Sequence, residues 1–493
     1  MKKKLLSLTV AATLAGVAST AQAVSMSTDG SGEVLFYPFY TVEGGNDTYV
    51  NLVNTTGNYK AVKVRFREAM NSREVLDFNL YLSPYDHWSA VVTAGANGGA
   101  VIKTADTSCT VPTSLAAPSE GVLGATVEFR SDEYSSDSIK GIERTREGYV
   151  EIIEMAEITD TRASAVNLTV NGINHVGGKP ADCARVQNAW AAGGDFVNET
   201  TVAGLDVTEP TGGLYGYGVL INVAEGTDAT YDAVALDDFY NPLTPAGDLH
   251  KTIGTESPGL GDALPASANF IDSAGAVQTA TFTANSVAEN AVDAVSAVMM
   301  HSAIMNDYVL EPSIAAGTDW VVTFPTKKEY VNGGITAPST VHAFRNPFTV
   351  GWDTAKSQAC ERIDVSFWDR EERQNTSEID FSPRRDSFVS LCFEANVLTF
   401  KNSNVLSGSS RVSNNLNVDF NNGWARIGFA QAGTATGDEA REISSDGTVY
   451  DFSGLPVVGF AVQKYVNGDL NGLLSNYAGS VTHKTQTTIT TAP

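Results

Sequence analysis

Residues 83–87 read Ser-Pro-Tyr-Asp-His and place three side chains of the hydrolytic-triad types close together in the sequence. Ser83, Asp86 and His87 could supply a nucleophile, an orienting acid and a general base if the base reached the serine hydroxyl. However, neighbouring Asp and His side chains usually diverge, and Ser83 precedes a proline and is not in a Gly-x-Ser-x-Gly elbow. Proline and aspartate are ordinary turn residues. We therefore predict a hairpin turn with no catalytic role.

A second candidate is Glu154 in the stretch GYVEIIEMAEI, residues 148–158. On a strand, Glu154 would lie on the apolar face of this segment. Burial there would raise its pKa, so it could act as the general acid of a glycoside hydrolase, with a second carboxylate about 5–9 Å away. The alternative is a structural role at a strand edge, at a bulge, or in an ion pair with an arginine, of which Arg144 and Arg146 are close in the sequence. We favour the structural interpretation.

Several loop acids could bind a calcium ion. Asp232, Asp237 and Asp238 lie in YDAVALDDFY, and Asp29 and Glu33 lie in STDGSGE. Carboxylate oxygens are the ligands that Ca²⁺ prefers, but the chain has no Asp-x-Asp-x-Asp-Gly loop. The alternative is that these acids are simply solvated. Calcium is the one cofactor that the sequence suggests.

Other chemistry-bearing patterns are weak. The six histidines never form the paired spacings of a catalytic zinc site, and GLYGYG (213–218) opens a predicted strand where a nucleotide-binding loop would open a helix. Aromatic residues could line a sugar-binding face, although such residues more often fill a sandwich core. They are Tyr37, Phe39, Tyr40, Trp88, Tyr215, Tyr217 and Trp368.

The chain has four cysteines, at positions 109, 183, 360 and 392. An even number in an exported protein indicates disulfides, and four cysteines allow three pairings. We predict Cys109–Cys183 and Cys360–Cys392, because each bond then stays within one half of the chain. The sequence contains no Cys-x-x-Cys pair, which argues against a structural zinc site.

The first 23 residues have the form of a secretory signal peptide. Lys2, Lys3 and Lys4 form the basic region, an apolar run follows, and Ala21-Gln22-Ala23 is a small-residue cleavage site. No later stretch is apolar over the ~18 residues that a transmembrane helix needs. We expect a protein exported to the periplasm, the cell surface or the extracellular space.

The composition is acidic: 57 Asp and Glu face 32 Lys and Arg, which gives a formal charge of −25. Such a chain repels nucleic acids and anionic membrane surfaces, so neither is an expected partner. Only 18% of residues are charged, while glycine is abundant with 44 residues. This balance favours an extracellular β protein over a charged helical one.

Alternating apolar and polar residues recur along the chain and predict half-buried antiparallel strands. In AVKVRFRE, for example, Lys63, Arg65 and Arg67 would lie on the face opposite the apolar residues. We predict a mainly β protein with two antiparallel, Ig-like β-sandwich domains, residues 24–340 and 341–493, after the signal peptide 1–23. The first domain would carry loop insertions and one or two helices. These are residues 180–190, and 287–305, where Ser286 and Glu289 form a capping box.

Blocks such as FYPFYTVEGGNDTYVNLVNTT, EGYVEIIEMAE and DWVVTFPTKKEYV resemble those of uncharacterised secreted bacterial cell-surface proteins. The resemblance covers most of the mature chain and implies secretion and a surface location. It transfers no functional residues.

These observations favour a non-catalytic, secreted structural or adhesive protein. It would act by self-association or by binding other surface components, through sheet faces or exposed strand edges. The alternative is a carbohydrate-binding protein, or a glycoside hydrolase that uses Glu154. Partners would then be glycans.

Overall fold

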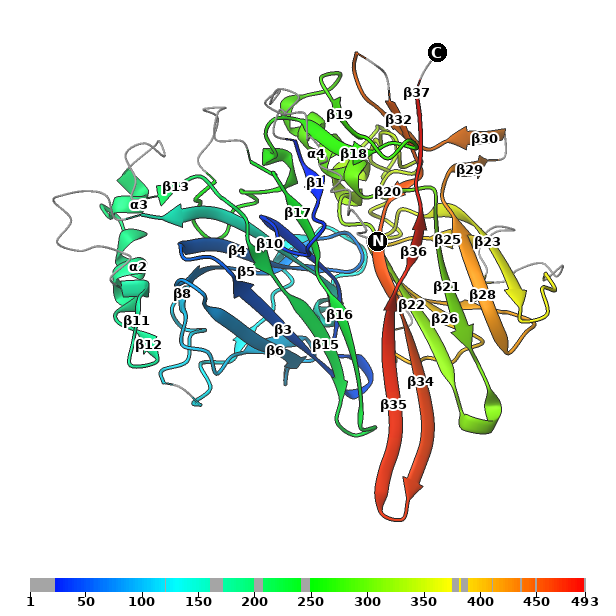
Figure 1. Ribbon diagram of the computed structural model, residues 1–493, viewed down its shortest axis with the longest axis horizontal. Coiled ribbons are helices and arrows are strands. Elements are labelled where there is room, and N and C mark those ends of the chain that lie inside the picture. Colours follow the sequence, from blue (N-terminus) through cyan, green and yellow to red (C-terminus); the bar gives the residue numbers. More distant parts are fainter. Residues whose placement is uncertain are drawn as a thin grey trace, which may run out of the picture.

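The structure is a computed structural model. It describes residues 23–119, 121–159, 172–198, 207–240, 249–374, 381–382, 389–409, 411–434, 437–447 and 450–491. The predicted signal peptide therefore lies outside the described residues, except for Ala23. Antiparallel sheets dominate the molecule, which confirms the prediction of a mainly β protein (Figure 1).

An eight-stranded sheet runs through the N-terminal half. It gathers strands that are far apart in the sequence, because β17 pairs with β2 and β10 lies between β2 and β4. Its strands, in spatial order, are β1 (Ser25–Met26), β17 (Val234–Asp237), β2 (Val34–Thr41), β10 (Glu147–Ile158), β4 (Tyr59–Glu68), β5 (Glu74–Leu82) and β8 (Cys109–Val111), with β13 (Val207–Thr208) beside β10.

A seven-stranded sheet faces the first across a shared apolar core. Phe66 and Leu80 from the first sheet and Leu52 and Trp88 from the second are buried in this core. The strands of the second sheet are β16 (Thr227–Asp232), β15 (Tyr217–Asn222), β3 (Asn46–Asn54), β6 (His87–Ala94), β7 (Ala100–Lys103) and β9 (Val127–Glu128), with β14 (Leu214–Tyr215) beside β3.

A second pair of sheets forms the C-terminal half, around a core that includes Trp320, Phe367, Leu398 and Ile427. The five-stranded sheet has the order β25 (Val389–Leu391), β23 (Glu361–Asp369), β28 (Asn422–Gly428), β21 (Ala303–Val309), β36 (Lys484–Gln486). The six-stranded sheet has the order β24 (Phe381–Ser382), β27 (Ser413–Leu416), β26 (Ala395–Phe400), β22 (Gly317–Thr323), β34 (Val458–Leu470), β35 (Leu473–Thr482).

The remaining short strands of the described residues form small sheets of their own beside these layers. They are β11 (His175–Val176) with β12 (Lys179–Pro180), β18 (Ser267–Ile271) with β19 (Val277–Thr281), β20 (Met300–His301) with β33 (Leu455–Pro456), β29 (Gln431–Thr434) with β30 (Gly437–Ala440), and β31 (Glu442–Ser444), β32 (Tyr450–Ser453) and β37 (Thr488–Thr491). The Ig-like description of the sandwiches stays a prediction.

The two halves pack against each other through the six-stranded sheet. Val321, Val397 and Phe460 of that sheet belong to the same buried cluster as the core of the N-terminal half. The hydroxyl of Thr323 also donates a hydrogen bond of 2.7 Å to the carbonyl oxygen of Pro38. The halves therefore share a continuous apolar interior.

Strand pairing does not follow the predicted division at residue 340. Strand β21 pairs with β28, and β22 pairs with β26 and β34, so both lie in the second pair of sheets. A cut at residue 340 would separate these two central strands from their partners. The strand order of a sheet is set by tertiary contacts, which the local sequence pattern does not report.

Both predicted helices are present, but the first begins at Cys183, because Pro180 belongs to β12, and the second is shorter than expected. Helix α2 (Cys183–Ala189) is capped by Asp182, and α4 (Val287–Val298) has the predicted Ser286–Glu289 capping box. The prediction that the second helix continues to 305 is wrong, because the chain pairs as β20 and β21 from residue 300 onward. The other helices are α3 (Asp195–Asn198), α5 (Lys327–Val331) and the 3₁₀ turns η1 (Glu43–Gly45), η2 (Asp132–Tyr134), η3 (Ile142–Arg146), η5 (Leu260–Asp262) and η6 (Pro312–Ile314). Within the described ranges, no helix has the length and apolarity that would let it cross a membrane.

Candidate functional site

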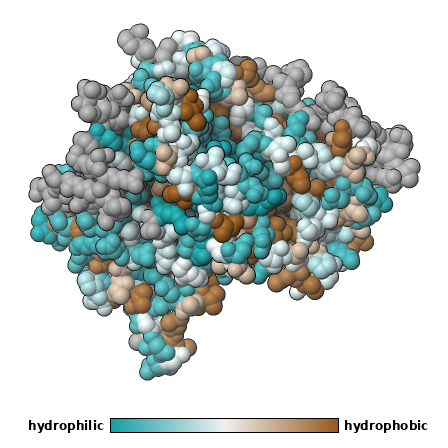
Figure 2. Space-filling view, turned by 180° about the vertical axis from the view of Figure 1, so that it is seen from behind, coloured by the Kyte–Doolittle hydropathy of each residue, from teal (hydrophilic) through white to brown (hydrophobic). Residues whose placement is uncertain are grey.

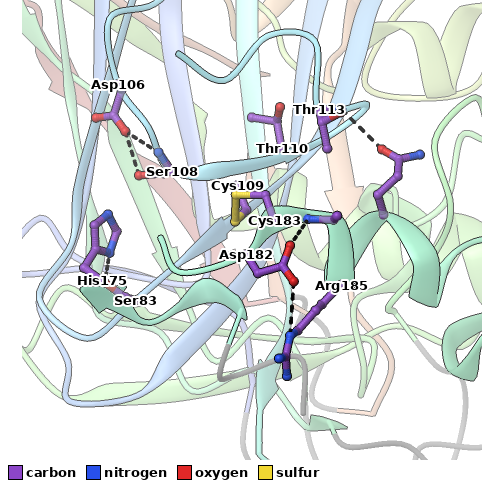
Figure 3. Close-up of a disulfide and its surroundings, with 12 residues drawn as sticks. Ser83, Asp106, Ser108, Cys109, Thr110, Thr113, His175, Asp182, Cys183 and Arg185 are labelled. Atoms are coloured by element: carbon purple, nitrogen blue, oxygen red, sulfur yellow. Dashed lines mark hydrogen bonds and ion pairs between the residues drawn. A yellow bond between two sulfur atoms is a disulfide. The ribbon is translucent and has the colours of Figure 1, made fainter. Parts of the chain in front are cut away.

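Both predicted disulfides are formed. Cys109 of β8 is bonded to Cys183, the first residue of α2, with a Cα–Cα distance of 5.2 Å (Figure 3). Cys360 is bonded to Cys392. The first bond therefore holds the α2 segment against the edge of the eight-stranded sheet.

The predicted turn at Ser83–Asp86 is present, but it is not a hairpin. Strand β5 before the turn belongs to the eight-stranded sheet, and β6 after it belongs to the seven-stranded sheet. The carboxylate of Asp86 accepts a hydrogen bond of 2.9 Å from the backbone N–H of Ser83, which stabilises the turn. The segment therefore carries the chain from one layer of the core to the other.

A histidine does approach Ser83, but it is His175 and not His87. The Nδ1 atom of His175 lies 2.8 Å from the Ser83 hydroxyl and 3.9 Å from an Asp86 oxygen (Figure 3). A catalytic triad needs the serine and the acid on opposite ring nitrogens. Here both face the same nitrogen, and His87 is exposed on β6. The arrangement is that of a polar turn.

Glu154 is fully buried and bound on both oxygens. One oxygen lies 2.7 Å from the Nζ atom of Lys60, and the other accepts a 2.8 Å hydrogen bond from the backbone N–H of Gly212. Burial raises the pKa of Glu154 to about 6, although Lys60 acts in the opposite direction. The predicted partners Arg144 and Arg146 bind other carboxylates. The site is a structural ion pair with a lysine partner that the sequence interpretation missed.

The loop acids are only partly brought together. Asp237 ends β17 and Asp238 follows it, whereas Asp232 is exposed at the end of β16 in the other sheet. Burial raises the pKa of both Asp237 and Asp238, and Asp237 is raised further by its neighbour. In the part of the chain that the structure describes, no group of three or more His, Cys, Asp or Glu side chains is placed to hold a metal ion. Calcium binding stays a prediction.

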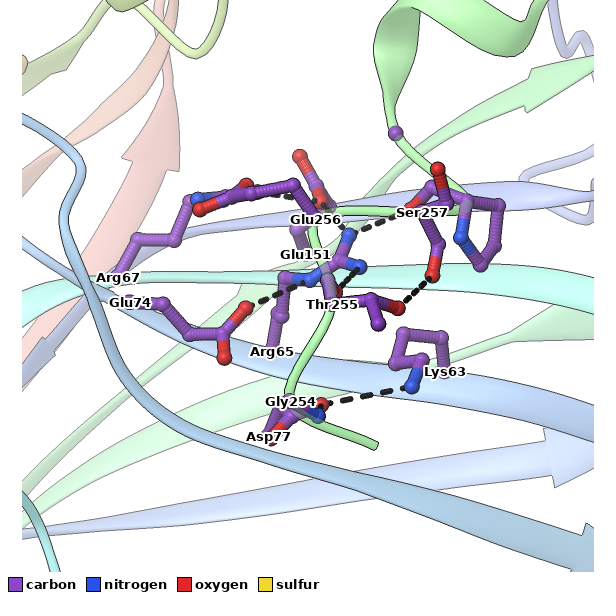
Figure 4. A network of polar contacts seen from close by, with 12 residues as sticks. Lys63, Arg65, Arg67, Glu74, Asp77, Glu151, Gly254, Thr255, Glu256 and Ser257 are labelled. Atoms are coloured by element: carbon purple, nitrogen blue, oxygen red, sulfur yellow. Dashed lines mark hydrogen bonds and ion pairs between the residues drawn. The ribbon is translucent and has the colours of Figure 1, made fainter. Parts of the chain in front are cut away.

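The charged face of β4 differs from the prediction. Lys63, Arg65 and Arg67 do point away from the apolar core, but all three are buried. Arg65 binds Glu74 at 2.9 Å and Glu151 at 3.0 Å, and Glu151 also binds Arg67 (Figure 4). Each cation on this face therefore has carboxylate partners on neighbouring strands or on the segment that covers them.

That cover is the segment 250–258, here called the strap. Arg65 donates hydrogen bonds to the carbonyl oxygens of Thr255 and Pro258 (Figure 4). Lys63 donates one to the carbonyl oxygen of Thr252. Glu256 of the strap adds a 3.1 Å ion pair with Arg67. The strap therefore covers the charged face of β4, and the side chains of that face are buried and not exposed to solvent.

A pocket of about 430 Å³ lies at the edge of this network. Its lining combines apolar side chains such as Phe78 and Leu115 with carboxylates that include Glu74, Asp77 and Glu128. Burial and the charge of Asp77 raise the pKa of Glu74 to about 7. An anionic ligand would be repelled here.

Most of the aromatic candidates are core residues, as expected. Tyr37, Phe39, Tyr40 and Trp88 are buried. Tyr215 is 40% exposed and Tyr217 is half-buried. Trp368 is also outside the core, because it lies on the outer face of the five-stranded sheet against Trp424, a residue that the sequence interpretation did not single out.

The most prominent surface feature is the hairpin of β34 and β35. It is built from two long strands joined at Asn471 and Gly472, which both have positive φ, as a type I′ turn requires (Figure 1). Its distal part extends beyond the rest of the molecule (Figures 1 and 2). Exposed apolar side chains lie along it. They are Val466, Leu473, Leu474, Tyr477 and Val481.

The hairpin is held against the N-terminal half along part of its length. The Nζ atom of Lys464 lies 2.7 Å from a Glu225 oxygen, and the side chain of Asn476 donates a 2.8 Å hydrogen bond to the Glu225 carbonyl. Ser480 of β35 also contacts the backbone of Thr230 in β16. The hairpin is therefore anchored between residues 464 and 480, and the turn at Asn471 and Gly472 lies beyond these contacts.

Comparisons with known proteins returned no matching family model, no matching curated protein and no matching solved structure.

Proposed function

We propose that this protein is an exported, non-catalytic structural protein of the cell surface or the extracellular space, built from two Ig-like β-sandwich units. We propose further that copies assemble through the β34–β35 hairpin. The signal-peptide pattern of residues 1–23 supports export. The two disulfides support an oxidising compartment.

The observation that carries the proposal is the exposure of apolar side chains on the first five residues of β35, which follow the turn at Asn471 and Gly472. Leu473 is 72% exposed, Leu474 52% and Tyr477 57%. Three large apolar residues within five positions form a local concentration, and exposed apolar patches on a folded surface mark interaction sites. Burial against a partner would stabilise contact by ~25 cal/mol for each Å² of apolar surface.

The charge distribution favours a second copy as the occupant. The chain carries a formal charge of −25, so most of its surface repels another copy. Between residues 465 and 481, however, Asp469 is the single charged side chain. Two copies can therefore approach tip to tip without the repulsion that opposes other contacts.

The hydrolase alternative receives no support from its candidate acid. Glu154 is enclosed, and its two oxygens are bound by Lys60 and by the Gly212 amide. A general acid must instead lie within reach of the leaving-group oxygen of a substrate.

Sedimentation velocity of the purified mature protein tests the proposal. Leu473→Ser, Leu474→Ser and Tyr477→Ser combined should shift oligomers to monomers. The control is Ile271→Ser with Val277→Ser, because this cross-strand pair lies on the β18–β19 hairpin and is 65% and 67% exposed. The control should assemble like the wild type. A monomeric wild type, or a tip variant that assembles equally well, would overturn the proposal.

A further inference from the structure

The outer face of the five-stranded sheet carries a pair of tryptophans. In β23 and β28, alternation places Phe367 and Ala425 in the core, and Trp368 and Trp424 on the opposite face. Trp368 and Trp424 are register partners whose rings stack 4.2 Å apart at an interplanar angle of 14°. Trp424 is 40% exposed. The sheet thus presents an aromatic surface to solvent.

A polar pocket of about 330 Å³ lies where β23 ends and β28 begins, so its residues are close in sequence to this pair. It is formed by the residues that follow β23 and those that precede β28, namely Asp369, Arg370, Glu371, Arg373, Asp419, Phe420, Asn421 and Asn422. Asp369 accepts hydrogen bonds from the backbone N–H groups of Glu371 and Arg373, so the loop at the pocket is held in place. The pocket offers carboxylates, guanidinium groups and amides side by side.

The same outer face continues across the sheet with polar groups. Asp307 of β21 is the register partner of Trp424 on its other side and is exposed. Two residues further along β28, Arg426 donates a 3.2 Å hydrogen bond to Gln486 of β36. The tryptophan pair therefore lies between a polar pocket and a polar sheet surface.

We propose that this face binds a neutral polysaccharide, with the Trp368–Trp424 pair as the platform. A pyranose ring has an apolar C–H face that packs on an indole, and hydroxyls at its edge that need both donors and acceptors. The pocket lining contains both kinds, as carboxylates and amide oxygens that accept and guanidinium and amide N–H groups that donate, although Arg373 already pairs with Asp369 at 2.6 Å. This inference goes beyond assembly and uses none of the hairpin residues.

The charges of the pocket and of the whole protein favour a neutral polysaccharide over an anionic one. The pocket lining has three carboxylates against two guanidinium groups, and the whole protein carries −25. A polyanion such as a nucleic acid or a sulfated glycan would be repelled, whereas an uncharged polyhydroxylated chain is not. A neutral glycan is thus the occupant that this surface fits.

Affinity electrophoresis in native gels tests the proposal, with laminarin, hydroxyethylcellulose, glycol chitin and dextran as separate probes. At least one should retard the wild type, and Trp424→Ala should weaken that retardation at least tenfold. The control is Phe344→Ala, which removes a 50% exposed aromatic outside this sheet and should be retarded like the wild type. Trp424→Phe, which keeps an aromatic ring, should retain part of the binding.

Three results would overturn the proposal. No neutral probe retards the wild type, Trp424→Ala is retarded as strongly as the wild type, or a further gel that contains the anionic polysaccharide heparin is the only one that retards the wild type. Thermal unfolding of each variant shows whether a loss of binding reflects a loss of fold. If Trp424→Ala instead changes sedimentation without any effect of polysaccharide, the face is a contact between copies and not a glycan site.

Discussion

The Nζ atom of Lys60 on β4 lies 2.7 Å from the Oε1 atom of Glu154 on β10, and both side chains are completely buried. Lys60 also lies 3.3 Å from Glu157. A buried ion pair adds little net stability, because both ions lose their hydration, but removing one partner leaves the other charge uncompensated. The ion pair with Lys60 therefore accounts for the presence of Glu154 on the apolar face of β10.

Glu154→Gln should lower the free energy of unfolding by at most about 3–5 kcal/mol, because buried Lys60 would lose its closer carboxylate and keep only Glu157 at 3.3 Å. The double variant Lys60→Met, Glu154→Leu should be closer to the wild type, since it removes both ions of the pair and leaves Glu157 bound by Asn58 and Thr211. Urea denaturation measures both. If Glu154→Gln were as stable as the wild type, the ion pair would not form in the folded protein.

Glu394 should make the stability depend on pH. It is fully buried, and burial raises its pKa to about 8, with Lys327 acting in the opposite direction. The folded protein therefore holds a proton that the unfolded chain releases above pH 4.5, so stability is lost as the pH rises from 4.5 to about 8. The slope for one such group is at most ~1.4 kcal/mol per pH unit. Denaturation series across this range should show a shallower fall in Glu394→Gln than in the wild type, and parallel curves would contradict the assignment.

The residues beside the Ser83–Asp86 turn should differ sharply in their effect on stability. Trp88 is fully buried next to Phe78, so Trp88→Ala should cost about 3–5 kcal/mol of unfolding free energy. His87 is exposed on the same strand, and His87→Ala should change that energy by less than ~0.5 kcal/mol. Thermal and urea unfolding of the two variants make the comparison. A large effect of His87→Ala would reopen the question of its role.

Removal of either disulfide should destabilise the protein. The Cys109–Cys183 bond spans 74 residues and Cys360–Cys392 spans 32. Chain-entropy arguments give about 4 kcal/mol for each, slightly more for the longer loop. Paired Cys→Ser variants, compared by urea denaturation, test this order. Mass spectrometry of the unreduced protein should recover these two linkages, and any other pairing would contradict the structure.

The sequence pattern located the strands because their alternation depends on one local property, the burial of every second side chain. It missed the burial of Lys63, Arg65 and Arg67, because the strap that covers them lies almost 200 residues away. It also extended α4 too far, since pairing of residues 300–309 with distant strands outweighs their helical spacing.

The two proposed interaction sites differ in whether a local sequence signal exists for them. Asn471-Gly472 followed by Leu473 and Leu474 is a local signal for a hairpin turn with apolar residues, although the sequence interpretation did not single it out. The tryptophan platform has no such signal, because Trp368 and Trp424 are 56 positions apart and meet only through the register of β23 and β28. Register between distant strands follows from the whole fold.

Photo-crosslinking at the hairpin tip tests the central claim most directly. The photoreactive residue p-benzoylphenylalanine would replace Leu473, which is 72% exposed, and in a matched sample Ile271, which is 65% exposed. Assembly through the hairpin predicts covalent dimers in the Leu473 sample, with mass spectrometry placing the crosslink in residues 465–481 of the second copy, and none in the Ile271 sample. Only monomers in the Leu473 sample, or dimers crosslinked elsewhere on the surface, would contradict it.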